Sequence, residues 1–361
     1  MKIVLILMAE RTGTGHKSSA NALEIGLRKL GYETKQLDCY SLMGKIGKSI
    51  EDSYIPITTK TPNLYYMSYS LAQTFPNVLH FMIYILFKKE FKKQLYSFKP
   101  DLIISVHSVF TKSVSKILKK ENLNIPFYIN VIDLVNPPNV WFDSNADMFF
   151  VPTEDIKNDY IKKGYDKNKI IVSGFPIRDD IERRTTPKTI IDKINILLVN
   201  PSVNLKKNIK YIKEISKLEN VSITFICGRD TKLYNKLIKL QKDGQISKDI
   251  KIFDFVKNMN EFLDKSHILL TKAGPNMLLE GAKSSTAIIV TGHIKGQENH
   301  NYEYVTKNNF GFKCENPNKI YKELKDFIEG PKLKDSLNNV LKSECNNGTN
   351  IIVNYISEHI K

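Results

Sequence analysis

A glycine turn between an apolar run and a helix is the part of this sequence best suited to chemistry. The run His267–Leu270 is typical of a buried strand, and a Lys-Ala-Gly-Pro-Asn turn leads from it into a helix that we predict to begin near Met277. Backbone N–H groups at a helix start have no partner within the helix, and the helix dipole adds partial positive charge there. A diphosphate fits on Gly274, Asn276 and Met277, and Glu280 can then accept hydrogen bonds from ribose hydroxyls.

The next turn along the chain offers groups suited to a polyhydroxyl ligand. A second apolar run, Ala287–Val290, leads through Gly292 and Gly296 to Gln297 and Glu298, which we expect at the start of a further helix. An amide beside a carboxylate supplies hydrogen-bond donors and acceptors together. Both turns also fit a plainer interpretation, in which ordinary strand–helix units use their glycines only to turn the chain. Spacing alone favours neither interpretation.

The N-terminal stretch repeats this arrangement and adds a histidine. The apolar run Lys2–Met8 is followed by a loop that contains Gly13 and Gly15, and then by a helix that begins near His16 and has Gly31 as a suitable C-cap. We expect this loop to face a phosphate or a sugar, although it lacks the spacing of a dinucleotide fingerprint. A neutral imidazole, with an ordinary pKa of about 6.5, can take a proton from a hydroxyl. The alternative is a histidine that only caps the loop.

Residues 61–87 carry no formal charge and are the best candidate for membrane contact. Polar residues interrupt the segment and leave Val78–Phe87 as its longest strongly apolar run, whereas a spanning helix needs about 20 predominantly apolar residues. We therefore expect a helix that lies in the interface of an anionic leaflet, with Phe81 and Phe87 in contact with lipid. The cluster that follows would bind the anionic headgroups through Lys88, Lys89, Lys92 and Lys93. The alternative is a buried helix followed by a solvated one.

Composition points to an anionic partner. A chain of 361 residues is long enough for two domains, and 42% hydrophobic with 25% charged residues is ordinary for a soluble globular protein. The formal net charge of +16 suits a membrane surface, nucleic acid or a phosphate-rich substrate. The lysines cluster beside apolar residues rather than alternating with stacking aromatics, so we expect no nucleic-acid partner. Four scattered cysteines fit free thiols in a reducing cytoplasm, and no signal peptide is expected.

Strands and helices alternate in both halves of the chain. This pattern predicts an α/β protein with two doubly wound parallel sheets of the Rossmann type that face a cleft. We expect a first domain over residues 1–180, a linker over 181–193 and a second domain over 194–348. A final helix over 349–361 would pack back on the first domain. Asp133 is predicted at the carboxyl end of a strand, where sheets of this kind bind their ligands.

Several stretches together resemble the diacylglycerol glycosyltransferases. KAGPN-x(3)-E-x-A and GQE-x(2)-N-x(2)-Y-V resemble the donor-site signature of that family. GTGHKSSANAL, GFPIRDDI, CGRDTKL and DFVKNMNEFL also match, so the resemblance extends over nearly the whole chain. The family comprises the monogalactosyldiacylglycerol synthases and the processive diacylglycerol glucosyltransferases, and it is related to the GlcNAc transferase that makes lipid II.

The resemblance implies a GT-B fold and an inverting transfer of a hexose from a UDP-sugar to a membrane lipid, with diacylglycerol as the expected acceptor. It places His16 at the acceptor site as the base. Asp133 would orient this base or replace it, with Trp141 nearby. The remaining implied contacts are uracil near Phe255 and Val256, ribose at Glu280, and sugar hydroxyls at Gln297 and Glu298.

The resemblance also bears on two basic residues, on cofactors and on the location of the protein. Arg229 either contacts phosphate or only braces the cleft, and Lys272 is either a phosphate contact or a surface charge. The sequence has no Asp-x-Asp pair, so we expect no metal and no other cofactor. The implied location is the cytoplasm, at the inner face of the cell membrane, where the protein would bind peripherally.

Departures from the family pattern keep other functions open. Relatives carry a glycine-rich loop after the first strand of the second domain, whereas Asn200–Lys207 has no glycine. Side chains of Ser202, Asn204 or Lys206 can substitute for the missing backbone contacts, or the site has lost turnover. A histidine expected shortly before Trp141 is also absent. Two alternatives therefore remain: the same donor chemistry on a polyprenyl-linked acceptor, and a non-catalytic membrane protein that binds a nucleotide-sugar.

Overall fold

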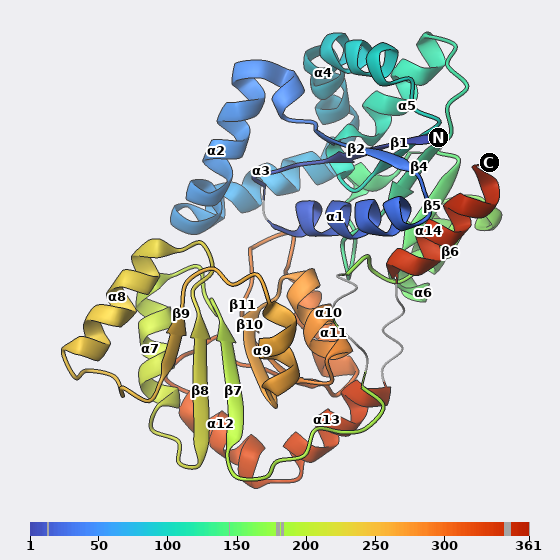
Figure 1. Cartoon of the computed structure of the whole chain (residues 1–361). Coiled ribbons are helices and arrows are strands. Elements are labelled where there is room, and N and C mark those ends of the chain that lie inside the picture. The colour runs from blue at the N-terminus through green and yellow to red at the C-terminus, as the bar shows by residue number, and fades with distance from the viewer. Residues whose placement is uncertain (13, 144, 178–180, 182–183, 343–347, 361) are drawn as a thin grey trace. The chain divides into compact units, whose positions relative to one another are not determined.

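The chain forms two compact units, each with one six-stranded parallel sheet (Figure 1). The computed structural model describes residues 1–12, 14–143, 145–177, 181, 184–342 and 348–360. The first unit comprises Met1–Asp179, Lys295–Gln297 and Asn346–Lys361, and the second comprises Asp180–Ile294 and Glu298–Cys345. The prediction of two doubly wound parallel sheets is therefore confirmed.

The sheet of the first unit has the strand order β2-β1-β3-β4-β5-β6. Its strands are β1 (Ile3–Met8), β2 (Glu33–Asp38), β3 (Leu102–Ser105), β4 (Phe127–Asn130), β5 (Met148–Val151) and β6 (Ile170–Val172). The central strands β1, β3 and β4 are apolar and buried along almost their whole length, as expected for parallel strands with both faces covered. The strand order reverses between β1 and β3, so a ligand crevice is expected there at the carboxyl ends.

Helices cover both faces of this sheet. They are α1 (Thr14–Lys29), α2 (Gly44–Lys60), α3 (Pro62–Thr74), α4 (Pro76–Phe98), α5 (Thr111–Lys120), α6 (Glu154–Lys162) and α14 (Gly348–His359), with short 3-10 turns η1 (Ser41–Met43), η2 (Ser108–Phe110), η3 (Asn139–Trp141) and η4 (Lys167–Lys169). Helices α1 and α14 pack together on one face, and α4 and α5 pack together on the other (Figure 1). The contact between α1 and α14 is close, since a Cβ atom at Gly26 would lie 3.0 Å from Val353 Cγ2.

Prolines divide the uncharged segment into two helices. Pro62 and Pro76 are the first residues of α3 and α4, a position where the missing N–H costs nothing. Helix α4 then continues without interruption through the lysines to Phe98, where Lys99 ends it in the left-handed conformation with φ of 46°. Within the described residues, no single helix is long and apolar enough to cross a membrane; α3 and α4 together pass by length and composition alone, across a bend of 96°.

The sheet of the second unit has the order β12-β11-β10-β7-β8-β9. Its strands are β7 (Ile194–Val199), β8 (Val221–Ile226), β9 (Lys251–Phe253), β10 (Ile268–Lys272), β11 (Ala287–Gly292) and β12 (Gly311–Lys313). Its helices are α7 (Leu205–Ile215), α8 (Thr231–Lys242), α9 (Met259–Lys265), α10 (Pro275–Lys283), α11 (Asn301–Lys307), α12 (Ile320–Glu329) and α13 (Lys332–Lys342). The order reverses between β7 and β10, which makes their carboxyl ends the expected ligand site.

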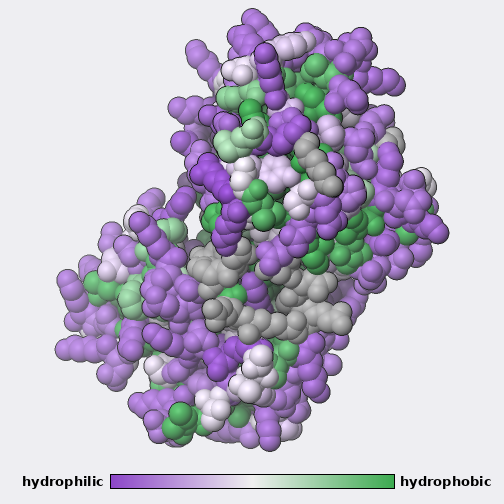
Figure 2. Space-filling view, turned by 45° about the vertical axis from the view of Figure 1, so that its right-hand side comes forward, coloured by the Kyte–Doolittle hydropathy of each residue, from purple (hydrophilic) through white to green (hydrophobic). Residues whose placement is uncertain are grey.

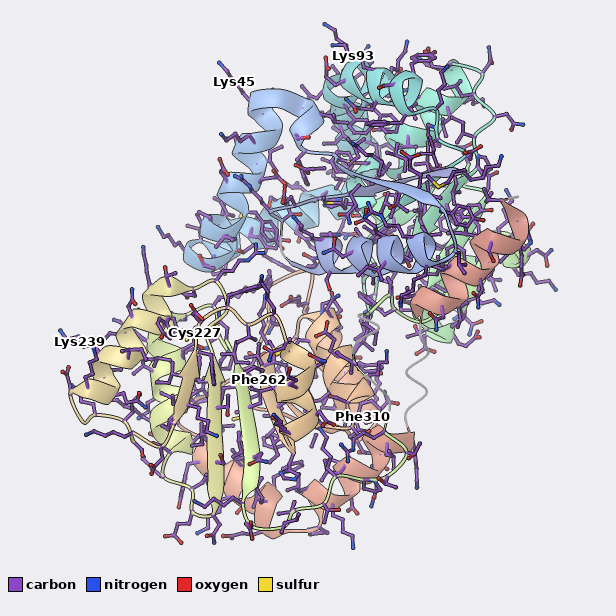
Figure 3. The ribbon with its side chains drawn as sticks, in the orientation of Figure 1. Lys45, Lys93, Cys227, Lys239, Phe262 and Phe310 are labelled. Atoms are coloured by element: carbon purple, nitrogen blue, oxygen red, sulfur yellow. The ribbon has the colours of Figure 1, made fainter. Side chains whose placement is uncertain are left out.

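Alternating side chains of the central strands build a core on each face of this sheet. Ile196 and Leu198 of β7 pack with α7, α8, α12 and α13, whereas Leu197 faces Leu263 of α9. Phe262 of α9 lies over Phe253, with ring centroids 5.0 Å apart (Figure 3). Ile181, in the predicted linker, is buried in the same cluster as Leu197.

A buried lysine from the predicted linker also packs on the second unit. The Nζ atom of Lys188 donates to the carbonyls of Leu263 and Ser266 at 2.6 and 2.7 Å and to Thr286 Oγ1 at 2.7 Å. It therefore adds a charged donor at the end of α9, where the Leu263 carbonyl also accepts from the Ser266 N–H.

Candidate active site

His16 lies at the carboxyl ends of β1 and β3 in the first unit, where the strand order predicts a ligand site. It is the third residue of α1, which begins directly after the β1 loop, and only 8% of it is exposed. Its Nδ1 atom lies 2.7 Å from the carbonyl oxygen of Val106, which follows β3. A carbonyl can only accept, so Nδ1 carries the proton and Nε2 is the basic nitrogen. Burial lowers the pKa of His16 to about 4, although the bond to Val106 opposes this shift. The ring is therefore neutral at physiological pH.

A second histidine, which the sequence analysis did not single out, lies against this ring. His107 follows β3, and its ring centroid lies 4.3 Å from that of His16 at an interplanar angle of 31°. It was missed because its position in the chain, 90 residues after the glycine loop, gives no local signal. The topology brings the two together, since β1 and β3 are adjacent in the sheet.

Asp133 lies three residues beyond the end of β4 rather than at the strand end itself, because β4 stops at Asn130. Its carboxylate is buried and accepts a hydrogen bond from the indole N–H of Trp141. Trp141 is fully buried in η3, so it positions Asp133 from within the core rather than presenting a surface to a ligand. Both residues belong to the carboxyl edge of the sheet that also holds His16.

The N-terminal glycine loop is described only in part. Gly13 lies outside the described residues, whereas Gly15 is in the first turn of α1 and is half-buried. Thr12, which precedes them, is buried with no hydrogen-bond partner for its hydroxyl. A buried hydroxyl without a partner is uncommon in folded proteins, and here it lies in the loop predicted to face a ligand.

The predicted membrane residues divide into exposed and buried ones. Phe81 is 57% exposed, whereas Phe87 is fully buried and stacks on Phe91 with centroids 4.5 Å apart. The prediction that Phe87 contacts lipid is therefore wrong in this conformation, because α4 turns that side toward α5 and the sheet. Other large apolar side chains of α3, α4 and the residue between them are exposed: Leu64, Met67, Leu71, Phe75, Val78, Met82 and Ile85.

The predicted lysines also differ from one another. Lys92 pairs with Glu121 at 2.9 Å and Lys93 with Glu90 at 2.9 Å, and Lys93 projects outward from α4 (Figure 3). Lys89 is exposed, and Lys88 is exposed with Nζ 5.5 Å from the centre of the Tyr84 ring. On the face shown in Figure 2, hydrophilic side chains cover most of the surface, which fits the strongly charged composition.

Helix α5 brings further lysines to Tyr84. Lys116 and Lys120 lie 4.4 and 5.4 Å from the centre of this ring, and Lys112 donates to Asn77 Oδ1 at 3.0 Å. Lys88, Lys112, Lys116 and Lys120 form what we call the α4–α5 lysine cluster. Among the described residues, none of the four forms an ion pair, unlike Lys92 and Lys93.

In the second unit, the turn after β10 begins α10 as the sequence indicated, but two residues earlier. Pro275 is the first helical residue and Gly274 is the N-cap. The side-chain amide of Asn276 is buried and has no hydrogen-bond partner for either polar atom. Met277 is half-buried, and Glu280 is buried one turn further along the helix. The structure therefore brings the predicted diphosphate residues together at the helix start.

The predicted pair Gln297 and Glu298 does not begin a helix. Residues 295–300 form turns, and α11 starts only at Asn301. The turn closes because Glu298 Oε2 accepts a hydrogen bond of 2.7 Å from the Ile294 N–H. The other carboxylate oxygen of Glu298 lies 3.8 Å from Lys272 Nζ, so Lys272 pairs with the residue that closes this turn. Gln297 falls in the first unit and Glu298 in the second.

Two buried side chains from outside the glycine-free loop after β7 hold it, and Thr291 Oγ1 is one of them, donating to the Pro201 carbonyl at 2.7 Å. The amide of Asn208 in α7 donates to Asn200 Oδ1 at 3.0 Å and to the Ser202 carbonyl at 2.7 Å, and it accepts from the Ser202 N–H at 2.8 Å. Asn204 caps α7 by accepting from the Lys207 N–H. Asn200 adopts φ of 36°, a conformation that asparagine tolerates better than most residues.

Hydrogen bonds therefore fix the shape of this loop, and most of its polar side chains form bonds within the loop. Ser202 and Asn204 use their polar groups within it, since Ser202 Oγ accepts from the Asn204 N–H at 3.1 Å. Lys206 is exposed. Of the three predicted substitutes for the missing glycines, Lys206 is the one whose side chain makes no hydrogen bond to the described residues of the loop.

Arg229 and Phe255 meet at the carboxyl ends of β8 and β9. Cys227 follows β8 (Figure 3), and Gly228 then turns the chain with φ of 62° to place Arg229. The guanidinium carbon of Arg229 lies 5.3 Å from the centre of the Phe255 ring, which is 52% exposed. Val256 is half-buried and lies beyond β9, which ends at Phe253. Within the part of the chain described, no group of three or more His, Cys, Asp or Glu residues is arranged to hold a metal ion.

Comparison with known proteins agrees with this arrangement. Residues 16–177 match the family model for monogalactosyldiacylglycerol (MGDG) synthase, and residues 198–342 match that for the glycosyltransferase family 28 C-terminal domain. Processive diacylglycerol beta-glucosyltransferases are similar over most of the chain. That of Bacillus cytotoxicus is 24% identical and that of Bacillus cereus strain B4264 is 25% identical, each covering 94% of this chain and 90% of the relative.

Solved structures share the fold at low identity. Acinetobacter baumannii MurG superposes with a TM-score of 0.66 at 14% identity, covering 99% of this chain and all of MurG. The UDP-GlcNAc 2-epimerase of Neisseria meningitidis, bound to UDP-GlcNAc, has a TM-score of 0.61 at 14% identity and covers 99% and 100% of the two chains. An epimerase shares the fold too, so the fold alone does not define the reaction.

The two parallel sheets and the paired domain matches define a glycosyltransferase of the GT-B fold. The match of its N-terminal half to the monogalactosyldiacylglycerol synthase model and of its C-terminal half to the family 28 model confirms the resemblance to the diacylglycerol glycosyltransferases.

Proposed function

We propose that this glycosyltransferase moves a hexose from a UDP-sugar to the hydroxyl of a membrane lipid, with diacylglycerol as the acceptor, and that the anomeric carbon is inverted. The observation that carries the proposal is the oriented neutral base: Val106 holds Nδ1 of His16, so Nε2 is left to take a proton. The names of the relatives, which describe diacylglycerol glucosyltransferases, support the acceptor.

The proposed reaction is a single displacement. His16 Nε2 removes the proton from the lipid hydroxyl as its oxygen bonds to the anomeric carbon, and the bond from that carbon to the UDP oxygen breaks. Asp133, held by Trp141, stabilises the positive charge that forms at the acceptor site. One direct displacement inverts the anomeric carbon, because the acceptor attacks from the side opposite the leaving UDP.

The donor half supplies electrostatic stabilisation of the leaving group. The buried Asn276 amide, which has no partner, and the N–H groups at the start of α10 are suited to a diphosphate. Arg229 and Lys272 supply positive charge nearby. We propose that no metal is obligatory, and a chelator should therefore leave turnover unchanged.

We further propose that the exposed apolar residues of α3 and α4 rest on an anionic membrane. The α4–α5 lysine cluster borders this apolar face, since Lys116 also lies 5.8 Å from the Phe81 ring centre. Lysines near an anionic bilayer contribute roughly 1 kcal/mol each. Apolar side chains beside unpaired lysines suit a protein that binds peripherally at the cytoplasmic face of the cell membrane.

The deciding experiment measures UDP release. UDP-glucose, UDP-galactose and UDP-GlcNAc are each incubated with diacylglycerol in anionic vesicles, and the product anomer is assigned by NMR. Release that requires both donor and lipid, with inversion, supports the proposal and identifies the sugar. Release with a polyprenyl-linked saccharide instead of diacylglycerol would move the function to that acceptor. UDP binding without release on either lipid would contradict transfer and favour the binding-only function.

A further inference from the structure

His107 has no role in the proposed reaction, yet it is one of the most constrained side chains at the site. It is 5% exposed and packs against His16, against Tyr40 at 5.4 Å and against Phe110 at 5.2 Å between ring centres. Its backbone is fixed as well, because Ser105 Oγ donates to its carbonyl at 2.9 Å. A polar ring that is fixed on several sides at the predicted ligand end of the sheet is suited to a specific function.

The hydrogen bonds of the two histidines assign complementary tautomers. His107 Nδ1 accepts from the Val109 N–H at 3.4 Å, so its neutral ring carries the proton on Nε2. In His16 the proton is on Nδ1, because Nδ1 faces the Val106 carbonyl. The two rings therefore differ in what they offer at Nε2: His16 offers an acceptor and His107 offers an N–H donor.

Electrostatics keeps His107 neutral during turnover, so the two histidines retain their different roles at Nε2. Burial lowers the pKa of His107 well below its ordinary value, and positive charge on His16 lowers it further. When His16 takes the acceptor's proton, His107 is therefore prevented from becoming charged. It remains a neutral donor before and after the proton moves.

We propose that His107 is a second acceptor-site residue, whose Nε2–H donates a hydrogen bond to an oxygen of the acceptor's polar headgroup while His16 Nε2 takes the reacting proton. The inference rests on the proposed transfer to a lipid hydroxyl. His107 exchanges no proton in this step; the acceptor O–H proton moves to His16, and the electron pair released by the donor leaves with UDP. Its contribution is to fix the oxygen that His16 must reach.

Two substitutions separate the donor role from packing. His107→Phe keeps a flat ring against His16, Tyr40 and Phe110 but removes the N–H, whereas His107→Gln keeps an N–H donor without the ring. UDP release is measured with the full chain while diacylglycerol in vesicles and the UDP-sugar are varied in turn. We expect His107→Phe to raise the KM for lipid about 3- to 10-fold, the usual value of one hydrogen bond, with the donor KM unchanged, and His107→Gln to recover part of that loss.

Other results would contradict either the role of His107 or the proposed function. A lipid KM of His107→Phe equal to that of the wild type would overturn the inference and leave a packing role, while the proposed function would stand. If the wild type shows no lipid-dependent release, the proposed function itself fails. A measurement independent of activity is the 15N NMR spectrum of histidine-labelled protein between pH 6 and 8. A proton on Nδ1 of His107 would overturn the inference, and a proton on Nε2 supports it.

Discussion

Replacing His16 with alanine should abolish most transfer while leaving donor binding intact. Loss of a general base usually costs roughly 10²–10⁴-fold in rate. We expect a loss near the lower end, about 10²-fold in kcat, because a pKa of about 4 makes the neutral ring a weak proton acceptor. The dissociation constant for UDP should not change, since His16 belongs to the first unit and the predicted diphosphate residues belong to the second.

The pH profile of kcat/KM tests the same reasoning without a mutation. The base works only when neutral, so activity falls as the pH drops through the pKa of the folded protein. With a pKa of about 4, activity should be nearly constant from pH 8 to pH 5.5. An unshifted histidine, with a pKa of about 6.5, would lose roughly 10-fold over that range.

These measurements need a control variant, and two results would contradict the role of His16 as a buried base. His359→Ala, at an exposed histidine of α14, should leave both kcat and the pH profile unchanged. A roughly 10-fold fall centred near pH 6.5 that disappears in His16→Ala would show that the base is not buried as described. Turnover that survives His16→Ala would remove His16 from the mechanism altogether.

Four further outcomes are expected. Glu280→Ala should weaken binding of the UDP-sugar about 10-fold in calorimetry, the usual loss of charged hydrogen bonds; an unchanged affinity would contradict the ribose role. Changing Lys116 and Lys120 to Gln should reduce sedimentation with anionic vesicles, whereas the matched double change of the ion-paired Lys92 and Lys93 should have less effect, and equal losses would contradict the α4–α5 cluster. Lys188→Met should lower the free energy of unfolding in urea by about 1–3 kcal/mol, because three buried oxygens each lose one hydrogen bond; no loss would mean that water replaces the amine. Stability should fall between pH 6.5 and pH 4, because the unfolded chain binds protons that buried His16 and His80, with pKa values of about 4, do not; a flat denaturation midpoint over that window would refute both shifts.

The fold followed from the sequence because parallel strands leave a strong signal. The apolar runs of β1, β7 and β10 are buried on both faces and interrupted by glycine turns, so their positions and the two doubly wound sheets could be predicted. The ends of helices were harder to predict where a side-chain hydrogen bond sets them. The helix after β11 starts late because the Glu298 carboxylate closes a turn first, and no periodicity reveals such a bond.

The proposed acceptor site could be predicted only in part. His16 stood out because it follows a glycine loop, whereas His107 and the lysines of α5 became recognisable only when strand order and helix packing brought them together. The exposure of Phe87 was predicted wrongly, because an apolar sequence does not reveal which side of a helix is buried. Separation along the chain hides these contacts, and a single sequence offers no way to recover them.

The loop after β7 shows where tolerance to mutation lies in such a site. In a glycine-rich loop, each glycine is constrained by its own backbone, and any side chain added there is costly. Here the shape of the loop depends on the Asn208 amide, which lies outside it on α7 and bonds to both Asn200 and Ser202. Thr291 of β11 adds a second such contact, to the Pro201 carbonyl. Selection should therefore act strongly on residues outside the loop and leave positions such as Val203 and Lys206 free to vary, which is the reverse of what a search for conserved glycines assumes.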